Sequence, residues 1–374
     1  MKLYLGLVTG EIFPGKAVGY SEETFGEVIL YCSKKFHHEI LTDPVYFGRI
    51  VVSDSPAVDN RQPMFWEIES YSPHLNGLVI LGKLRKIPLQ NKSDDLKEYL
   101  AVNSITGFKP EQPEKLKMVL QKRGLVFGAI SFSPNKVKKM LSRGGFSKRT
   151  FNKVKDPIKA LSTPLEFYWD FNGNHIEKRY IVVAYDLGLP YSILRNLSRF
   201  GCDIRVVPAD VPPEEVIALK PEGILLAGGP GNPDDMGYAV NNIARLLGLR
   251  PILATGLGHN LLALSIGAKL ERLKNPHFGS DIKVERETWC NGIPGKNGYR
   301  TNQTHGIGVN RLSVEQAGFK VTLVNPEDGS VEGYDNEDYL VQSYAFSLGK
   351  RDYFTSSCIR RFIDCMESHR ARRN

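Results

Sequence analysis

The chain has 374 residues, 41% of them hydrophobic and 24% charged, a composition typical of a folded globular protein with room for two or three domains. Its net charge of +8 and pI of about 9.1 are compatible with an acidic binding partner. No apolar run of about 18 residues occurs, which excludes a membrane-spanning helix. Five scattered cysteines without a CxxC pair exclude a disulfide framework or zinc knuckle. We expect a reducing compartment, the cytoplasm or an organelle matrix.

Residues 1–130 predict an α+β domain. The N-terminal MKLYLGLVTGE is too short for a secretory signal and predicts a first strand. Further strand patterns are broken by Gly, Pro and Asp, in GEVILYCS (26–33), RIVVSDS (49–55) and LNGLVILG (75–82). Helical patterns follow at 93–103 and 113–124, the second ending at Gly124.

Residues 131–178 are rich in Lys, Ser, Gly and Asn and predict a linker. Its basic part, 134–155, contains Lys136, Lys138, Lys139, Arg143, Lys148, Arg149, Lys153 and Lys155. Such a run can bind nucleic acid or an acidic protein face. Because no aromatic platform or helix-turn-helix accompanies it, we expect a solvated linker, with a protein-docking face as the alternative ahead of nucleic acid. The basic tail from His369 to Arg373 is expected to fray.

From residue 179 to 374, strand and helix patterns alternate, which predicts an α/β domain with a doubly wound, mainly parallel sheet. Two glycine-rich turns, AGGPGNP (227–233) and TGLGHN (255–260), follow predicted strands. Ligands of such sheets bind at the carboxyl ends of the strands. These turns therefore mark the expected site.

The segment PILATGLGHNLLAL (251–264) predicts a strand, a sharp turn and then a helix from Asn260 onward. This is the geometry of a nucleophile elbow, which exposes one reactive side chain above a sheet. The residue at the tip is Gly256, which has no side chain. Glycine adopts the strained backbone of an elbow without steric cost.

Several motifs together resemble one family, the small, glutamine-hydrolysing subunit of carbamoyl phosphate synthetase. They are FGEVILYCS with HHEILTDPVY (25–46), VVAYDLGLPYSILR (182–195), LLAGGPGNP (225–233), GLGHNLLALSIGAK (256–269) and THGIGV (304–309). The resemblance extends from about residue 3 to 366. It implies a small-subunit domain followed by a class I glutamine amidotransferase domain.

The family's chemistry implies three catalytic side chains. An elbow cysteine attacks the glutamine carboxamide, and a histidine oriented by a glutamate moves the protons. Aligned without gaps, the family's G-I-C-L-G-H-Q places the cysteine at Gly256. Its F-Q-G-H-P-E places the histidine at Tyr344 and the glutamate at Phe346. All three positions are vestigial, and the two aromatic side chains are expected to fill the pocket.

Other positions of the family's substrate pocket are retained in part. They are Ser33, Gly229, Gly231, Leu257, Asn260, Thr304, Gly306 and Ile307. Asn260 replaces the family's Gln, and Thr304 and Ile307 replace the Asn and Phe of Q-N-H-G-F. Turn geometry explains the retained residues as well as ligand binding does.

No other residue type in the sequence restores the reaction. Thr255 next to the elbow tip is a poor nucleophile, and Cys290 lies in a polar loop. His259, His277 and His305 lack metal-ligand spacing, and no Cys or carboxylate accompanies them in a motif. We expect neither a metal nor a cofactor.

The hypothesis is a non-hydrolysing homologue of the small subunit that acts as a structural or regulatory partner in a complex. Its expected partner is a carbamoyl phosphate synthetase large subunit or an active small-subunit paralogue, in the arginine or pyrimidine pathway. One alternative is an active glutamine-hydrolysing subunit that supplies ammonia. The other is a scaffold or binding subunit repurposed for another assembly. Nucleic acid and membrane are not expected partners.

Overall fold

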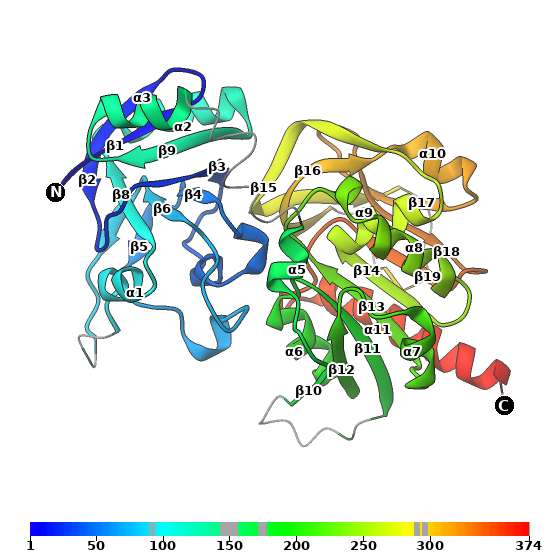
Figure 1. Ribbon diagram of the computed structural model, residues 1–374. Coiled ribbons are helices and arrows are strands. Elements are labelled where there is room, and N and C mark those ends of the chain that lie inside the picture. Colours follow the sequence, from blue (N-terminus) through cyan, green and yellow to red (C-terminus); the bar gives the residue numbers. More distant parts are fainter. Residues whose placement is uncertain are drawn as a thin grey trace. The chain divides into compact units, whose positions relative to one another are not determined.

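The computed structural model describes residues 1–89, 91, 94–142, 156–170, 177, 179–287, 292–293 and 298–373. The chain divides into two compact units, Met1–Lys155 and Asp156–Asn374 (Figure 1). Among the described residues, no helix combines the length and apolarity required to cross a membrane.

The first unit is built around a closed barrel. In barrel order its strands are β1 (Lys2–Leu7), β2 (Ile12–Ala17), β8 (Thr106–Pro110), β6 (Gly77–Ile80), β4 (Ile50–Ser53), β3 (Thr24–Tyr31) and β9 (Val126–Ser131). Alternate residues such as Leu3, Leu5 and Leu7 enter the core, because successive side chains of a strand point to opposite faces. A small sheet of β5 (Ala57–Asp59) and β7 (Lys83–Arg85) accompanies the barrel.

The two helices predicted in this unit lie close to their expected positions. Helix α1 (Leu96–Val102) begins after Asp95, whose carboxylate accepts a hydrogen bond from Lys97 N at 2.7 Å. Helix α2 (Pro113–Arg123) starts with proline and ends before Gly124, which has a φ of +67°. Its buried leucines, Leu116 and Leu120, pack into the barrel core.

The described ends of the predicted linker 131–178 are folded, which corrects that expectation. Helix α3 (Pro134–Ser142) packs on β1 and β9 and buries Val137 completely. Helix α5 (Pro157–Leu161) packs on β11 (Tyr180–Leu187), and β10 (Phe167–Trp169) pairs with β12 (Cys202–Pro208). These elements were not predicted from the sequence, because the composition of 131–178 is mostly polar and few of the elements' apolar residues are buried. Lys136, Lys138 and Lys139 lie on α3, whereas the basic residues from Arg143 to Lys155 lie outside the described residues.

The second unit contains a 10-stranded sheet in the order β10-β12-β11-β13-β14-β19-β18-β17-β15-β16. The strands β12, β11, β13 (Gly223–Gly228), β14 (Ile252–Gly256) and β19 (Val341–Tyr344) are parallel, as predicted. The remaining strands pair antiparallel. They are β10, β15 (Leu270–Arg286), β16 (Tyr299–Val309), β17 (Lys320–Val324) and β18 (Val331–Asn336). The sheet is therefore parallel at its centre and antiparallel toward both edges.

Helices cover both faces of this sheet, as its doubly wound pattern predicts. One face packs against α7 (Pro213–Ala218), α8 (Gly237–Leu246), α9 (Leu257–Ser265) and α10 (Arg311–Gln316). The other packs against α6 (Tyr191–Arg199) and α11 (Tyr353–Arg373). In β13, Ile224 and Leu226 face the first core and Leu225 and Ala227 the second.

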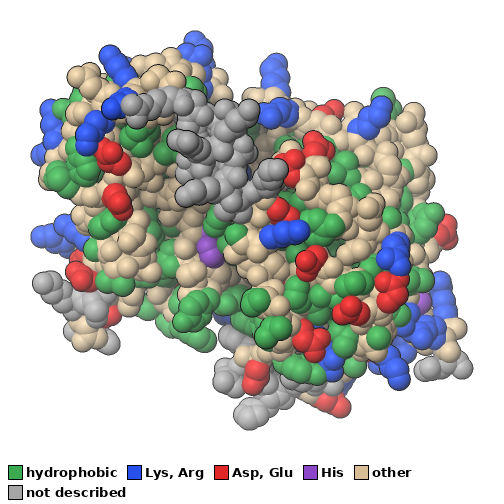
Figure 2. Space-filling view, in the orientation of Figure 1, with side chains coloured by type: hydrophobic (Ala, Val, Ile, Leu, Met, Phe, Trp, Pro, Cys, Tyr) green, Lys and Arg blue, Asp and Glu red, His purple; other side chains and the backbone are tan. Residues whose placement is uncertain are grey.

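The basic C-terminal segment continues α11 to Arg373, which corrects the expectation of a frayed tail. Arg370 Nη1 lies 2.9 Å from Glu222 Oε1, and its guanidinium lies over the ring of Tyr180. On the face shown in Figure 2, Lys and Arg side chains gather where α11 ends, with acidic side chains nearby.

Candidate functional site

The predicted elbow is a single-residue turn at Gly256. Strand β14 ends at this residue and α9 begins at Leu257, three positions before the expected start at Asn260. Gly256 has φ +57° and ψ −121°, and a Cβ added there would lie 2.8 Å from the carbonyl oxygen of Gly228. Residues other than glycine rarely adopt this backbone conformation. The elbow backbone is thus present at a residue that supplies no nucleophile.

The glycine-rich loop after β13 lies beside the elbow, because Gly228 pairs with Gly256 in the sheet register. Gly228, Gly229 and Gly231 all have φ values between +123° and +132°. A Cβ on Gly229 would lie 2.5 Å from Leu257 Cβ. Close approach and positive φ therefore account for these glycines without a ligand.

Tyr344 lies at the end of β19, opposite Thr255 of the elbow strand. Its side chain is 1% exposed and lies in the core that α6 and α11 cover. Arg361 Nη1 of α11 donates to the Tyr344 hydroxyl at 2.9 Å, and Arg361 Nη2 lies 2.8 Å from Asp335 Oδ2. The phenol is thus held by an arginine rather than positioned to move protons at the elbow.

Phe346 is also 1% exposed and extends the same core. Its ring centroid lies 5.4 Å from that of Tyr344 and 5.5 Å from that of Phe354. Such separations are typical of packed aromatic pairs. An apolar cluster therefore occupies the two positions that the sequence motifs predict for the family's acid–base pair.

The other predicted pocket residues of the second unit belong to two elements that pack together, α9 and β16. Asn260 is buried in α9, and its Oδ1 has no hydrogen-bond partner among the described residues. Thr304, Gly306 and Ile307 are partly buried on β16. Ser33 belongs to the first unit, just after β3.

His259, in the first turn of α9, is completely buried and packs against Tyr334, whose hydroxyl donates to the His259 carbonyl. Its Nδ1 lies 2.8 Å from Ser343 Oγ, and its Nε2 has no partner among the described residues. Burial, and to a smaller extent the nearby His305, lowers the pKa of His259 to about 3. The imidazole is therefore a neutral packing residue.

This burial makes stability depend on pH. The pKa of His259 is about 3 in the folded chain against 6.5 for the free group, so protonation favours the unfolded state. The contribution of the neutral His259 to the free energy of unfolding is complete above pH 6.5. It falls by about 1.4 kcal/mol per pH unit as the pH is lowered toward 3. We expect the free energy of unfolding of His259→Asn, which keeps a polar atom near Ser343, to lack this dependence on pH. Urea unfolding of both proteins between pH 7 and 4 measures the difference, and parallel pH profiles would contradict it.

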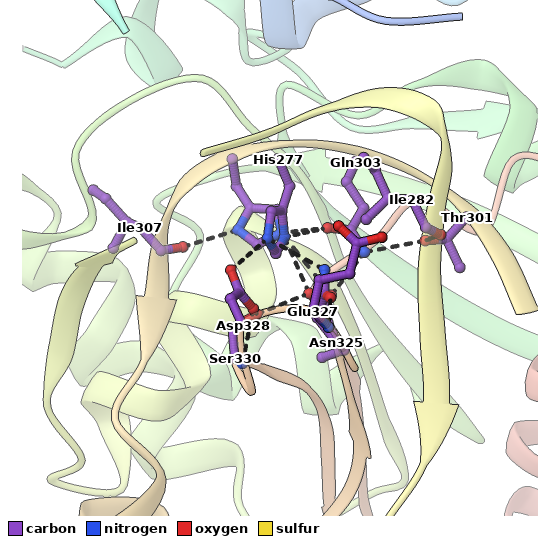
Figure 3. Close-up of polar contacts among 11 residues, drawn as sticks. His277, Ile282, Thr301, Gln303, Ile307, Asn325, Glu327, Asp328 and Ser330 are labelled. Carbon is purple, nitrogen blue, oxygen red and sulfur yellow. Dashed lines mark hydrogen bonds and ion pairs between the residues drawn. The ribbon is translucent and has the colours of Figure 1, made fainter. Parts of the chain in front are cut away.

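A second polar cluster brings His277 of β15, His305 of β16 and Glu332 of β18 together. Figure 3 shows His277 with its neighbours Gln303 and Asp328. His277 Nδ1 lies 3.2 Å from Glu332 Oε1, and His277 Nε2 lies 2.9 Å from Asp328 Oδ2. Burial lowers the pKa of His277, but the hydrogen bonds and charges of these two carboxylates outweigh burial and raise the pKa to about 9. Burial also lowers the pKa of His305.

The expectation that no carboxylate accompanies these histidines is therefore wrong. His277 pairs with His305 across an antiparallel register, and β18 and the turn before it add the carboxylates of Glu332 and Asp328. Sequence spacing carries no signal for such a cluster, because its members come from three strands. His259 is not a member of this group.

The described cysteines supply no replacement nucleophile at the elbow. Cys202 and Cys358, the latter on α11, are buried in the core that α6 and α11 cover, and burial raises the pKa of the Cys202 thiol far above its usual range. Burial also raises the pKa of Cys32 and Cys365. A raised pKa suppresses the reactive thiolate. Cys290 lies outside the described residues.

Two families match the two units. The carbamoyl-phosphate synthase small chain, CPSase domain, matches residues 5–130, and glutamine amidotransferase class-I matches residues 183–346. The carbamoyl phosphate synthase small chain of Syntrophotalea carbinolica is 34% identical, over 99% of this chain and 99% of its own. The small chain of Clostridium perfringens is 31% identical, over 92% of this chain and 93% of its own. The pyrimidine-specific small chain of Bacillus subtilis is 33% identical over 98% of this chain and 97% of its own. The chain belongs to the carbamoyl phosphate synthase small chain family.

Proposed function

We propose that this chain is a non-hydrolysing member of its family, a pseudo-glutaminase that serves as a structural or regulatory subunit. The observation that carries the proposal is the elbow residue Gly256, which has the elbow backbone at φ +57° and no side chain. Glutamine hydrolysis through an acyl-enzyme requires a nucleophile with a base about 2.6–3.2 Å away. The aligned base and orienting positions, Tyr344 and Phe346, are buried aromatic residues instead.

The proposed partner is a carbamoyl phosphate synthase large subunit, or an active paralogue of the small subunit. Support comes from the length of the match, since the curated relatives align over nearly the whole chain and not over the amidotransferase domain alone. Retention of both domains after loss of the catalytic groups fits a subunit kept for its surfaces. A synthetase with this partner would draw on free ammonia.

Glutamate release from glutamine tests the loss of activity. We expect the purified chain to release no glutamate above the rate without protein, with the Bacillus subtilis small chain assayed in parallel. We expect Gly256→Cys to remain inactive because the aligned base and acid are also absent, and to lose roughly 1–3 kcal/mol of stability from backbone strain. Gly256→Ala is the matched control, since it carries the same strain without a thiol.

Turnover by the unaltered chain that a thiol alkylator abolishes would contradict the proposal. Glutamine hydrolysis by Gly256→Cys but not by Gly256→Ala would show that an effective base survives near the elbow. The partner is tested separately by affinity purification from the source cells and mass spectrometry. We expect a carbamoyl phosphate synthase subunit, and recovery of an unrelated assembly in its place would favour the repurposed scaffold.

A further inference from the structure

The two histidines of the β15–β16–β18 cluster each have one ring nitrogen fixed by an outer partner. His305 Nδ1 lies 3.1 Å from the carbonyl oxygen of Ile307. A carbonyl only accepts hydrogen bonds, so His305 Nδ1 carries a hydrogen. In the neutral imidazole, which burial favours, Nε2 then presents a lone pair to the inside of the cluster.

His277 is oriented in the same way by a carboxylate. Its Nε2 lies 2.9 Å from Asp328 Oδ2, and Asp328 is itself held by the backbone N–H and hydroxyl of Ser330, at 3.0 and 2.7 Å. His277 Nε2–H therefore donates to Asp328. The other nitrogen, Nδ1, faces inward and lies 3.2 Å from Glu332 Oε1.

Acceptor atoms converge at the centre of this cluster. Gln303 Nε2 donates to Glu332 Oε2 at 2.9 Å and to Thr301 Oγ1 at 3.1 Å, which turns Gln303 Oε1 toward both histidines. That oxygen lies 2.7 Å from His277 Nδ1 and 3.0 Å from His305 Nε2. With His305 neutral, an oxygen lone pair and a nitrogen lone pair face each other at hydrogen-bond distance. Glu332 is fully buried as well, so its charge requires a positive partner, either the protonated His277 or a bound cation in its place.

We propose that this cluster binds one divalent transition-metal ion, zinc in the first instance, through His277 Nδ1, His305 Nε2 and the Glu332 carboxylate. Two imidazoles and a carboxylate form a zinc ligand set. Each histidine already donates its other N–H to a carboxylate or a carbonyl, as metal-bound histidines nearly always do. The ion would replace the proton on His277 Nδ1.

The spacing suits a site that contracts on binding. The three ligand atoms lie within 4.8 Å of one another, and His305 Nε2 lies 4.0 Å from Glu332 Oε2. Bond lengths of about 2.0–2.1 Å in a tetrahedral zinc site bring ligand atoms to about 3.4 Å, so shifts on the order of 1 Å are required. Gln303 Oε1 or a water molecule completes the coordination. Imidazole ligands favour zinc, cobalt or nickel over magnesium and calcium.

A metal ion here would cross-link β15, β16 and β18, and this role does not depend on whether glutamine is hydrolysed. The test uses the full chain, stripped with a chelator and titrated with Zn²⁺ by calorimetry. We expect one ion per chain at micromolar or tighter affinity and a higher melting temperature with zinc. His305→Gln and Glu332→Gln are each expected to weaken binding at least tenfold, whereas His369→Gln, a histidine on α11, leaves it unchanged.

If a variant fails to fold, X-ray absorption spectroscopy of the zinc-loaded, unaltered chain identifies the zinc ligands instead. Two imidazoles and oxygen ligands without sulfur are the expected coordination. Cysteine sulfur in the zinc shell would overturn the proposal. So would the absence of saturable binding up to about 100 μM zinc, or equal binding by the chain and its folded His305→Gln and Glu332→Gln variants.

Discussion

Phe346→Glu is expected to destabilise the second unit by at least about 4 kcal/mol, although glutamate is the residue that the motif comparison predicts for an active family member at this position. Phe346 is 1% exposed among the rings of Tyr344 and Phe354. Removing a buried Phe side chain alone costs about 3–5 kcal/mol, and burying a carboxyl group in its place adds to that loss. Urea unfolding followed by circular dichroism measures the change.

Phe346→Leu is the matched control, because it keeps an apolar side chain at the same site. We expect this variant to fold and to lose about 1–2 kcal/mol, much less than the glutamate variant. If Phe346→Glu is insoluble, limited proteolysis of the two variants gives the same ranking. Equal stability of the glutamate and leucine variants would mean that a polar, solvated pocket persists at this position.

Arg361→Leu is expected to cost roughly 2–4 kcal/mol, because it breaks a largely buried ion pair and leaves the Tyr344 hydroxyl without this donor. The side chains of Arg361 and Asp335 are only 13% and 15% exposed, and their closest atoms lie 2.8 Å apart. The guanidinium joins α11 to the ends of β18 and β19. Thermal and urea unfolding measure the loss.

Two further variants separate what the hydrogen bond to Tyr344 and the ion pair each contribute to the stability loss of Arg361→Leu. Tyr344→Phe removes only the hydroxyl and is expected to cost about 1 kcal/mol. Arg372→Leu removes an exposed arginine from the same helix and is expected to change stability by less than about 0.5 kcal/mol. A loss as small for Arg361→Leu as for Arg372→Leu would show that the buried pair contributes little.

Together these contacts give a physical reason for the state of the site. An active elbow must hold a side chain in a strained conformation and keep polar groups in an enclosed pocket, and both requirements reduce stability. Gly256 relieves the strain, and Tyr344 and Phe346 bury aromatic area at the two positions that the motif comparison predicts for the family's ionisable pair. Under the proposed loss of activity, the residues at these three positions are ones that stabilise the fold.

Much of the architecture is local and could be predicted from the sequence. The alternating strands and helices after residue 179, the helix stop at Gly124 and the elbow turn at Gly256 each depend on residues close together in the chain. The motifs also identified the family, because they are short, contiguous stretches that can be compared residue by residue. The assignment of Gly256, Tyr344 and Phe346 to the family's catalytic positions also comes from local motifs, and it stays a prediction.

The tertiary structure decided what depends on pairing between distant segments. Closure of the first unit into a barrel requires β1 to pair with β9, more than a hundred residues away, and the helices at the ends of the predicted linker acquire their partners only after folding. The burial of Tyr344 against Arg361, and the meeting of His277, His305 and Glu332, likewise join residues from separate strands and helices. Local spacing cannot encode such contacts, because strand register and helix packing set them, and both are determined by the assembled core.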